Sequence, residues 1–390
     1  MLGENRPMTE LPAPLNPPDR LLCGPGPSNP DPRVLDVMRK PMLGHLDPDF
    51  HRILEDLIQL LQLAYRRSDG LTIALSASGT SGMEAGLASL AEPGDTVIVA
   101  ACGFFGNRMI DIAHRHRLEV IELRAPFGKA VPNDQILDTL AANPQTRLVA
   151  VVHAETSTGV AHPLEELGAA MRDSDALLLA DCVTSLGGME LEAGAWGIDY
   201  AYSCSQKCLG APPGISPVSL SEQAMDRIRS RTAPVPFSFD FELLRKYWID
   251  RPATYHHTTP NTQYYALYEG LRLALEEGLE ERWQRHAQVG GYLQSALRER
   301  GYELLADEEV QLAQLSAVRV PEGVNGKDVQ TRLLREHNIE VGGGLGPDAP
   351  DIWRIGMMGT NAHVETADRL LEAFDAVLEA PRAGVSAGRA

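Results

Sequence analysis

The residues best suited to chemistry in this chain are a lysine and an aspartate, each found where an apolar, strand-like run ends. Lys207 comes after the run Tyr200–Ser203 and before a turn rich in glycine and proline, where its amine is held in place. A fixed amine can form and re-form a Schiff base with a carbonyl compound. Asp181 ends an apolar run that begins at Leu177, and a carboxylate there can hold a protonated ring nitrogen. Together the two side chains predict pyridoxal phosphate chemistry.

A third feature is the glycine-bounded turn Ser78-Gly79-Thr80-Ser81-Gly82, which joins a strand-like run to a helical pattern. Glycines let the chain turn with its amides forward, and a helix N-terminus favours a phosphate. The turn matches neither GxGxxG nor GxxxxGK[ST], which argues against a dinucleotide or a nucleoside triphosphate. Taken alone, a tight strand-to-helix turn explains it equally well. Beside Lys207 and Asp181 it predicts the phosphate end of the same cofactor site.

The elements that must position these residues alternate along the first part of the chain. Short β-rich runs are separated by helical patterns, which is typical of a mainly parallel sheet covered by helices on both faces. We therefore predict an α/β fold for this part. The predicted strands are Leu71–Ser76, Thr96–Ala101, Val120–Leu123, Leu148–His153, Ala176–Ala180 and Tyr200–Ser203.

From about residue 260 the pattern changes to longer helices with a few short strands, which predicts a smaller α+β domain. Helices are predicted over Tyr264–Gly278, Trp283–Arg298, Val329–His337 and from Val364 onward, and strands over Ser316–Val320, Ile339–Val341 and Ile352–Ile355. The expected domains are a proline-rich extended arm over 1–20, a large cofactor-binding domain over 21–275, the small domain over 276–380 and a tail over 381–390.

Length, composition and charge limit the other possibilities. The 390 residues are 44% hydrophobic and 23% charged, which is ordinary for a globular chain of more than one domain. A net charge of -18 argues against nucleic acid or an anionic membrane as a partner. Five cysteines, with no CxxC pair, no secretory signal and no membrane span, predict reduced thiols in the cytoplasm. No metal site is expected.

The glycine turn, the strand-end aspartate and the lysine, in this order, resemble class V (fold type I) pyridoxal-phosphate aminotransferases. More narrowly, they are similar to the alanine–glyoxylate and serine–pyruvate branch of that family. The resemblance covers nearly the whole chain, from Leu21 to Gly356. The matching segments are Leu21–Asn29, Gly44–Pro48, Ser76–Gly86, His153–Gly159, Asp181–Gly188, Ser203–Gly214, Tyr255–Thr258 and Trp353–Gly356.

The resemblance implies a role for each matching residue. Lys207 would bind the cofactor aldehyde as a Schiff base, and Asp181 would pair with the pyridine nitrogen. Arg354 would bind the substrate carboxylate beside the backbone of Gly26. The phosphate would be held by Ser78, Gly79, Thr80 and Gln206, joined by Tyr255 and Thr258 from the other subunit of a homodimer. Thr156 would bond near the ring hydroxyl, and Phe105, or else its neighbour Phe104, would stack on the ring at a position that is often tryptophan in this branch.

The resulting hypothesis is an enzyme that moves an amino group from alanine or serine to glyoxylate or pyruvate. Within the same fold class, alternatives are an aminotransferase acting on ureidoglycine or aminoethylphosphonate, and a cysteine desulfurase. The desulfurase is disfavoured because every cysteine lies at or before Cys208 and because Gln206 stands where desulfurases usually carry histidine. From other classes, a non-enzymatic cofactor-binding subunit and a lysine-based enzyme without the cofactor stay open.

Plainer local roles stay open as well. Asp181 alone could be a helix cap or a turn former. Arg354 could pair with the nearby Asp351 in an ion pair of little energetic weight.

Overall fold

The computed structural model describes residues 11–379, so half of the predicted arm and the whole of the predicted tail lie outside the described residues. Residues 11–20 form neither a helix nor a strand, and the leucines in this segment, Leu11 and Leu15, are exposed. Within residues 11–379, no helix is both long enough and apolar enough to span a lipid bilayer.

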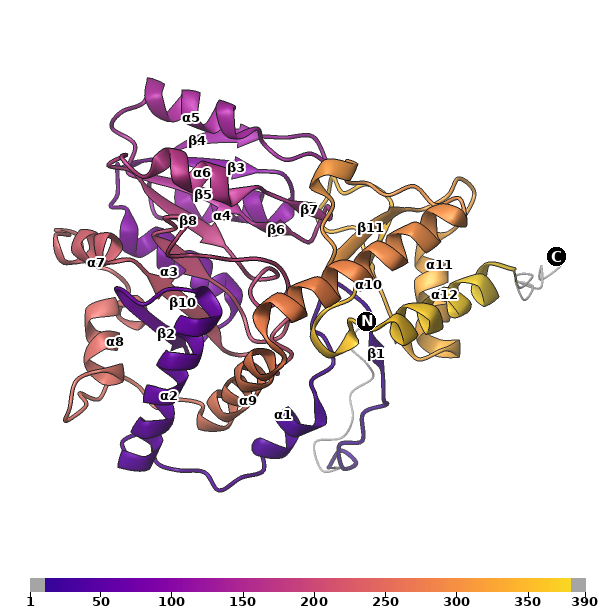
Figure 1. Cartoon of the computed structure of the whole chain (residues 1–390), viewed down its shortest axis with the longest axis horizontal. Coiled ribbons are helices and arrows are strands. Elements are labelled where there is room, and N and C mark those ends of the chain that lie inside the picture. Colours follow the sequence, from indigo (N-terminus) through magenta and orange to yellow (C-terminus); the bar gives the residue numbers. More distant parts are fainter. Residues whose placement is uncertain (1–10, 380–390) are drawn as a thin grey trace.

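A seven-stranded sheet forms the centre of the larger part of the molecule (Figure 1). Its strand order is β2–β10–β9–β8–β5–β3–β4, and all neighbouring pairs are parallel except the two made by β10. The predicted α/β fold is therefore confirmed. The strands are β2 (Leu71–Leu75), β3 (Thr96–Ala101), β4 (Glu119–Arg124), β5 (Leu148–Val152), β8 (Leu177–Asp181), β9 (Tyr200–Tyr202) and β10 (Ser216–Leu220).

Strand β10 is the one member of this sheet that the sequence pattern does not predict. Pro217 and two serines interrupt its apolar pattern, and proline is usually excluded from the interior of a sheet. The strand is nevertheless fully buried and pairs with β9 on one side and β2 on the other. Tertiary burial has overridden the local pattern here.

In the larger part of the molecule the helices pack on the seven-stranded sheet or on one another (Figure 1). They are α1 (Pro32–Val37), α2 (Pro48–Tyr65), α3 (Gly79–Leu90), α4 (Phe104–Arg115), α5 (Asn133–Ala142), α6 (Leu164–Met171), α7 (Glu222–Arg229), α8 (Phe241–Trp248) and α9 (Asn261–Glu277). The strands β5 and β8 are buried at every position because helices cover both of their faces. This rigid core fixes the ends of the strands, from which the site residues project.

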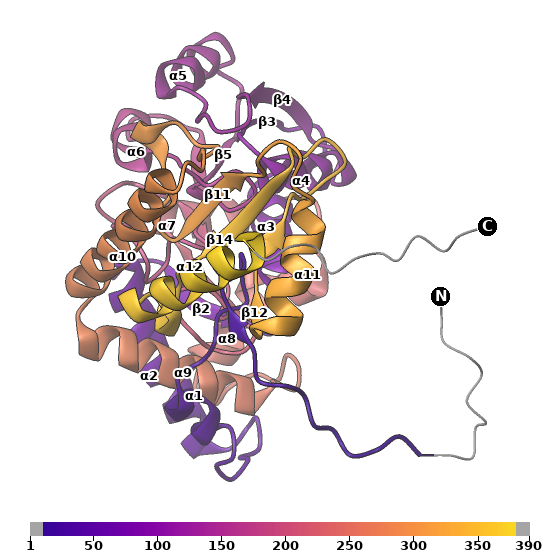
Figure 2. The ribbon, with the colours of Figure 1, turned by 90° about the vertical axis from the view of Figure 1, so that its right-hand side faces the viewer.

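The smaller part contains a three-stranded antiparallel sheet with the order β11–β14–β13. Figure 2 shows α11 and α12 in front of this sheet, with α10 beside them. The elements are β11 (Leu315–Arg319), β13 (Gly342–Gly343), β14 (Ile352–Gly356), α10 (Leu279–Glu299), α11 (Gly326–Glu336) and α12 (Val364–Glu379). A separate short pair joins β1 (Leu21–Leu22) to β12 (Ile339–Glu340) in parallel.

The hydrophobic core changes between α9 and α10. Leu267 and Leu271 of α9 belong to the core around the seven-stranded sheet, whereas Val289 and Leu293 of α10 belong to the smaller core. The helical stretch divides at Gly278, whose φ of 90° lies in a region that favours glycine. Cys23 also packs in the smaller core, so the beginning of the described chain joins its distant end. The domain limits given above stay predictions.

Candidate active site

The predicted site residues gather at the carboxyl edge of the seven-stranded sheet. Asp181 is the last residue of β8, and Lys207 lies in the loop after β9. Helices α3 and α4 begin at the same edge, directly after β2 and β3. Ligands of open α/β sheets bind at this edge because the strand ends leave a crevice there. One cavity is lined by eight of the predicted residues, namely Ser78, Gly79, Thr80, Phe105, Thr156, Asp181, Gln206 and Lys207.

Asp181 is buried and held in place by two donors. The Tyr202 hydroxyl donates to Oδ2 at 2.5 Å, and the Val183 N–H donates to Oδ1 at 2.9 Å. Burial raises the pKa of Asp181 to about 6, although the two hydrogen bonds act to lower it. The hydrogen bond from Val183 corresponds to the turn-forming role considered above. The same side chain also lines the cavity, so the two roles do not exclude each other.

Tyr202 is a site residue that the sequence reasoning misses. Its backbone pairs in register with Asp181 across the parallel strands β8 and β9, which brings its hydroxyl to the carboxylate. The sequence does show a tyrosine at the end of the strand that precedes Lys207. Its contact with Asp181 could have been predicted only if β8 and β9 had been expected to be neighbours in the sheet.

Lys207 is half-buried at the cavity, and its Nζ donates a hydrogen bond to the carbonyl of Pro25. Burial lowers the pKa of this amine, which favours its neutral form. Gly26 follows Pro25 and has a φ of 103°, a backbone region that favours glycine. A Cβ atom at position 26 would lie 2.4 Å from the lysine Nζ. Glycine at this position therefore leaves room for the amine.

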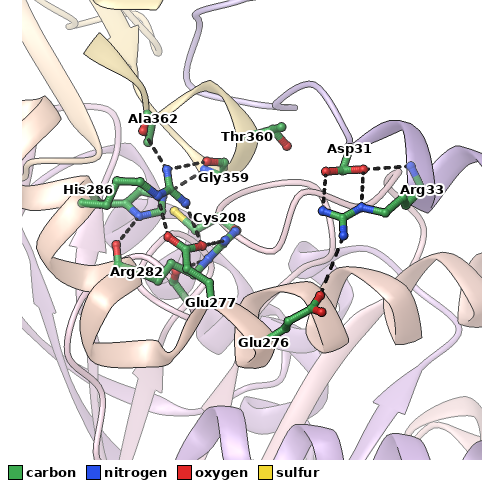
Figure 3. Close-up of polar contacts among 12 residues, drawn as sticks. Asp31, Arg33, Cys208, Glu276, Glu277, Arg282, His286, Gly359, Thr360 and Ala362 are labelled. Atoms are coloured by element: carbon green, nitrogen blue, oxygen red, sulfur yellow. Dashed lines mark hydrogen bonds and ion pairs between the residues drawn. The ribbon is translucent and has the colours of Figure 1, made fainter.

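A buried arginine binds the backbone of the loop that carries Lys207, here called the lysine loop (Figure 3). The guanidinium of Arg282, on α10, donates through Nη2 to the Cys208 carbonyl at 2.6 Å and through Nε to the Gly187 carbonyl at 3.0 Å. Cys208 directly follows Lys207 in the chain. The backbone directly after Lys207 is thus held by a charged donor from the smaller part of the molecule.

The same arginine shares the carboxylate of Glu277 with Arg285. Both guanidinium groups contact Glu277, and Arg285 donates to the carbonyls of Gly359 at 3.1 Å and Ala362 at 2.6 Å. Burial opposes ionisation, but the hydrogen bond from Arg285 and the charges of both arginines lower the pKa of Glu277 to about 2. The cluster joins the lysine loop to the segment that follows β14.

The N-terminus of α3 forms the opposite wall of the cavity. Ser78 is its N-cap and accepts a hydrogen bond from the Ser81 N–H at 3.3 Å. Gly79 packs tightly, because a Cβ atom there would lie 3.1 Å from Val183 and 3.2 Å from Cys204. The amide oxygen of Gln206 is buried without a hydrogen-bond partner. This wall therefore combines a helix N-terminus with the side-chain amide of Gln206, whose N–H groups, unlike its oxygen, can donate to a phosphate.

Phe105 is the aromatic residue that lines the cavity, and Phe104 packs against it edge to face with ring centroids 5.6 Å apart. The first turn of α4 is held by the buried carboxylate of Glu155. This group accepts from the N–H of Phe105 at 3.0 Å and from the N–H of Gly106 at 3.1 Å. Burial raises the pKa of Glu155. The position of the aromatic ring therefore depends on a carboxylate that sequence reasoning did not select.

Arg354 projects from the central strand β14 of the small sheet, and only 7% of the residue is exposed. Its Nε donates to the Gly343 carbonyl at 2.6 Å, and its Nη1 lies 3.5 Å from the carbonyl of Thr156, a residue of the cavity wall. Burial lowers the pKa of Arg354 to about 10. In the described part of the chain no carboxylate lies within ion-pair distance of this guanidinium, so the pairing with Asp351 is not formed.

Two predicted phosphate ligands do not line the cavity of their own chain. Tyr255 is 56% exposed and Thr258 is also exposed, with their hydroxyl oxygens 3.5 Å apart. A site shared between two subunits requires exposed residues of this kind. The homodimer itself, and the role of both residues in it, stay predictions.

These residues fit pyridoxal phosphate. A single cavity presents an amine, a buried carboxylate, a helix N-terminus, an aromatic ring and the side-chain amide of Gln206, whose N–H groups can donate to a phosphate. The fold and the cavity define the class of fold type I, pyridoxal-phosphate-dependent enzymes.

Comparisons with known proteins identify the family within this class. The family model "Aminotransferase class-V" matches residues 35–360. A curated relative, alanine–glyoxylate aminotransferase of Drosophila melanogaster, is 36% identical over 96% of this chain and 96% of its own length. The crystal structure of an alanine–glyoxylate aminotransferase from Nostoc sp. has 44% sequence identity and a TM-score of 0.92, covering 97% of this chain and 100% of that one. The chain therefore belongs to the class V aminotransferases.

A second similar structure belongs to an enzyme named for a different amino donor. The ureidoglycine–glyoxylate aminotransferase of Bacillus subtilis has 36% sequence identity and a TM-score of 0.91, covering 96% of each chain. The family, the aminotransferase activity and the cofactor predicted from sequence are thus confirmed. The roles of individual residues stay predictions.

Proposed function

We propose that this enzyme transfers the amino group of a small amino acid, alanine or serine, to a small 2-oxo acid, glyoxylate or pyruvate. The observation that carries the proposal is that Lys207 and Asp181 line one cavity and that Arg354 contacts Thr156 in the wall of this cavity. They provide an amine, a carboxylate and a planar fork that can bind a substrate carboxylate in a bidentate manner. The names of the Drosophila and Nostoc relatives support alanine as the donor and glyoxylate as the acceptor.

Pyridoxal phosphate, when bound, supplies an aldehyde that condenses with amines and a cationic ring that accepts the electron pair released at the substrate Cα. Asp181, held by Tyr202, would keep the ring nitrogen protonated. Ser78, Gly79, Thr80 and Gln206 would hold the phosphate, Thr156 would bond near the ring hydroxyl, and Phe105 would cover the ring.

The remaining steps belong to the protein side chains that face the substrate. Arg354 fixes the substrate carboxylate beside Gly26, which determines the bond at Cα that is broken. The Nζ of Lys207 then takes the proton from Cα, because burial lowers its pKa and leaves more of the amine in the neutral form. The buried arginine Arg282 keeps this amine in position through the Cys208 carbonyl.

We further propose a homodimer with shared active sites, located in the cytoplasm. The exposed hydroxyl groups of Tyr255 and Thr258 support the shared site, since they are free to complete the phosphate site of another subunit. The reducing compartment is supported by the cysteines, all five of which are buried and unpaired.

The test is a set of half-reactions with the purified, cofactor-loaded protein. We expect alanine or serine to remove the absorbance of the bound cofactor and to release pyruvate or hydroxypyruvate, and glyoxylate to restore the absorbance. A protein that keeps its absorbance with both donors would not be this enzyme. Faster reaction with ureidoglycine would favour the activity named for the Bacillus subtilis relative. Lys207→Ala is the matched control, because without the amine that takes the proton from Cα it should release neither pyruvate nor hydroxypyruvate from any donor.

A further inference from the structure

Arg108 lies at the rim of the cofactor cavity and has no role in the assignments above. It projects from the first turns of α4, and its Nη1 donates a hydrogen bond to Thr80 Oγ1 at 3.0 Å. Thr80 belongs to the N-terminal turn of α3, where the phosphate is expected. Arg108 is also one of the residues that line the cavity. The guanidinium group of Arg108 is therefore hydrogen-bonded to Thr80, one of the predicted phosphate ligands.

Two aromatic rings hold this guanidinium in place. Its central carbon lies 4.9 Å from the ring centroid of Phe104 and 5.0 Å from that of Phe105. Such cation–π contacts favour one position of a long side chain and reduce the entropy lost when it binds a ligand. Phe105 and Arg108 are three residues apart, so they share a face of the helix. The residue predicted to cover the cofactor ring thus also steadies the arginine.

The charge of Arg108 is not used within the chain. In the described residues no carboxylate lies within ion-pair distance of its guanidinium, whereas most other arginines on the surface are paired. Thr80 and the rings of Phe104 and Phe105 are its neighbours, and all are neutral. A cation kept free of counter-charges beside a helix N-terminus is suited to an anionic ligand.

The phosphate group needs such a cation. The predicted ligands Ser78, Gly79, Thr80 and Gln206 are neutral, and the chain as a whole carries a charge of -18. A helix N-terminus supplies only about half an elementary charge, against nearly two on the phosphate. Apart from Lys207, whose amine is needed for the aldehyde, Arg108 is the cationic side chain that lines the cavity. We propose that Arg108 is a further cofactor-binding residue, which forms an ion pair with the phosphate of pyridoxal phosphate.

The proposal rests on the cofactor of the proposed function, and binding measurements test it separately from activity. Cofactor-free protein is titrated with pyridoxal phosphate and, in parallel, with pyridoxal, which has the same ring and aldehyde but no phosphate. We expect Arg108→Gln to raise the Kd for pyridoxal phosphate by about 10- to 100-fold, as the loss of a charge-assisted hydrogen bond implies, and to leave the Kd for pyridoxal unchanged. Arg108→Lys should restore part of the affinity, because it keeps the charge.

Arg115→Gln is the control, since Arg115 lies on the same helix, is 70% exposed in its side chain and pairs with Asp111. It should bind both compounds as the unaltered protein does. The proposal is wrong if Arg108→Gln binds pyridoxal phosphate normally, or if it weakens both compounds equally, which would indicate a packing role. An enzyme that binds the cofactor through Arg108 but ignores alanine and serine would refute the proposed function and leave this inference intact.

Discussion

The buried arginine behind the lysine loop provides a prediction whose size can be worked out from the structure. Arg282 donates to two buried carbonyl groups, those of Gly187 and Cys208, and shares Glu277 with Arg285. In Arg282→Gln the shorter side chain leaves both carbonyls without a charged donor, while Glu277 keeps one arginine. A buried acceptor that loses its partner costs about 1–3 kcal/mol. With the loss of half of the ion pairing of Glu277, we expect destabilisation by about 3–5 kcal/mol.

The matched control is Arg298→Gln, on the same helix as Arg282. Arg298 also forms an ion pair, with Glu308, but the two side chains are 38% and 81% exposed. Exposed pairs contribute only about 0–1 kcal/mol, because water already solvates both charges. Both variants remove one positive charge from α10, so they differ mainly in the burial of that charge.

The assay is urea unfolding of the cofactor-free protein, since a bound ligand would add its own stabilisation. Tryptophan fluorescence and circular dichroism should be recorded together, because coincident transitions are needed before a free energy of unfolding is assigned. Arg282→Gln should have a clearly lower midpoint than Arg298→Gln. If the two free energies of unfolding lie within about 1 kcal/mol of each other, the reasoning about buried and exposed arginines is wrong for this cluster.

Other predictions concern the cavity itself. Lys207→Ala should abolish turnover and leave circular dichroism unchanged, so a normal rate would end its catalytic role. Arg354→Lys should raise KM for carboxylate substrates more than it lowers kcat, because lysine lacks the planar fork, and an unchanged KM would contradict this. The pKa of Asp181 in the cofactor-free protein is about 6. Because its carboxylate is protonated below that pH, the affinity for the cofactor should fall as pH drops through about 6. Asp181→Asn should bind the cofactor weakly at every pH. If the variant and the unaltered protein show the same pH profile of affinity, the role of Asp181 is refuted. Gly26→Ala should weaken cofactor binding because a Cβ atom would overlap the lysine amine, and normal affinity would show that the loop can shift.

The sequence is informative where chemistry depends on residue type and short spacing. The strand-end position of Asp181, the glycine-bounded start of α3 and the lysine after β9 can be read directly, because each is determined by a strand and the turn that follows it. Alternating strands and helices likewise predict the parallel sheet. Strand β10 is missed, since Pro217 weakens its pattern and only its burial between two strands makes it part of the sheet.

Contacts between residues far apart in sequence are decided only by the tertiary structure. The bond from Tyr202 to Asp181 depends on the register of two strands, and the contact of Glu155 with the start of α4 depends on how separate loops pack. Arg282 reaches Cys208 from 74 residues away. Arg108 sits in an ordinary helical pattern, and its free charge is visible only when its surroundings are known. The sequence by itself determines which reactive groups are present and where strands end. Their environment, and therefore their charge state and orientation, is set by packing over long distances, because burial and hydrogen bonding depend on every neighbour at once.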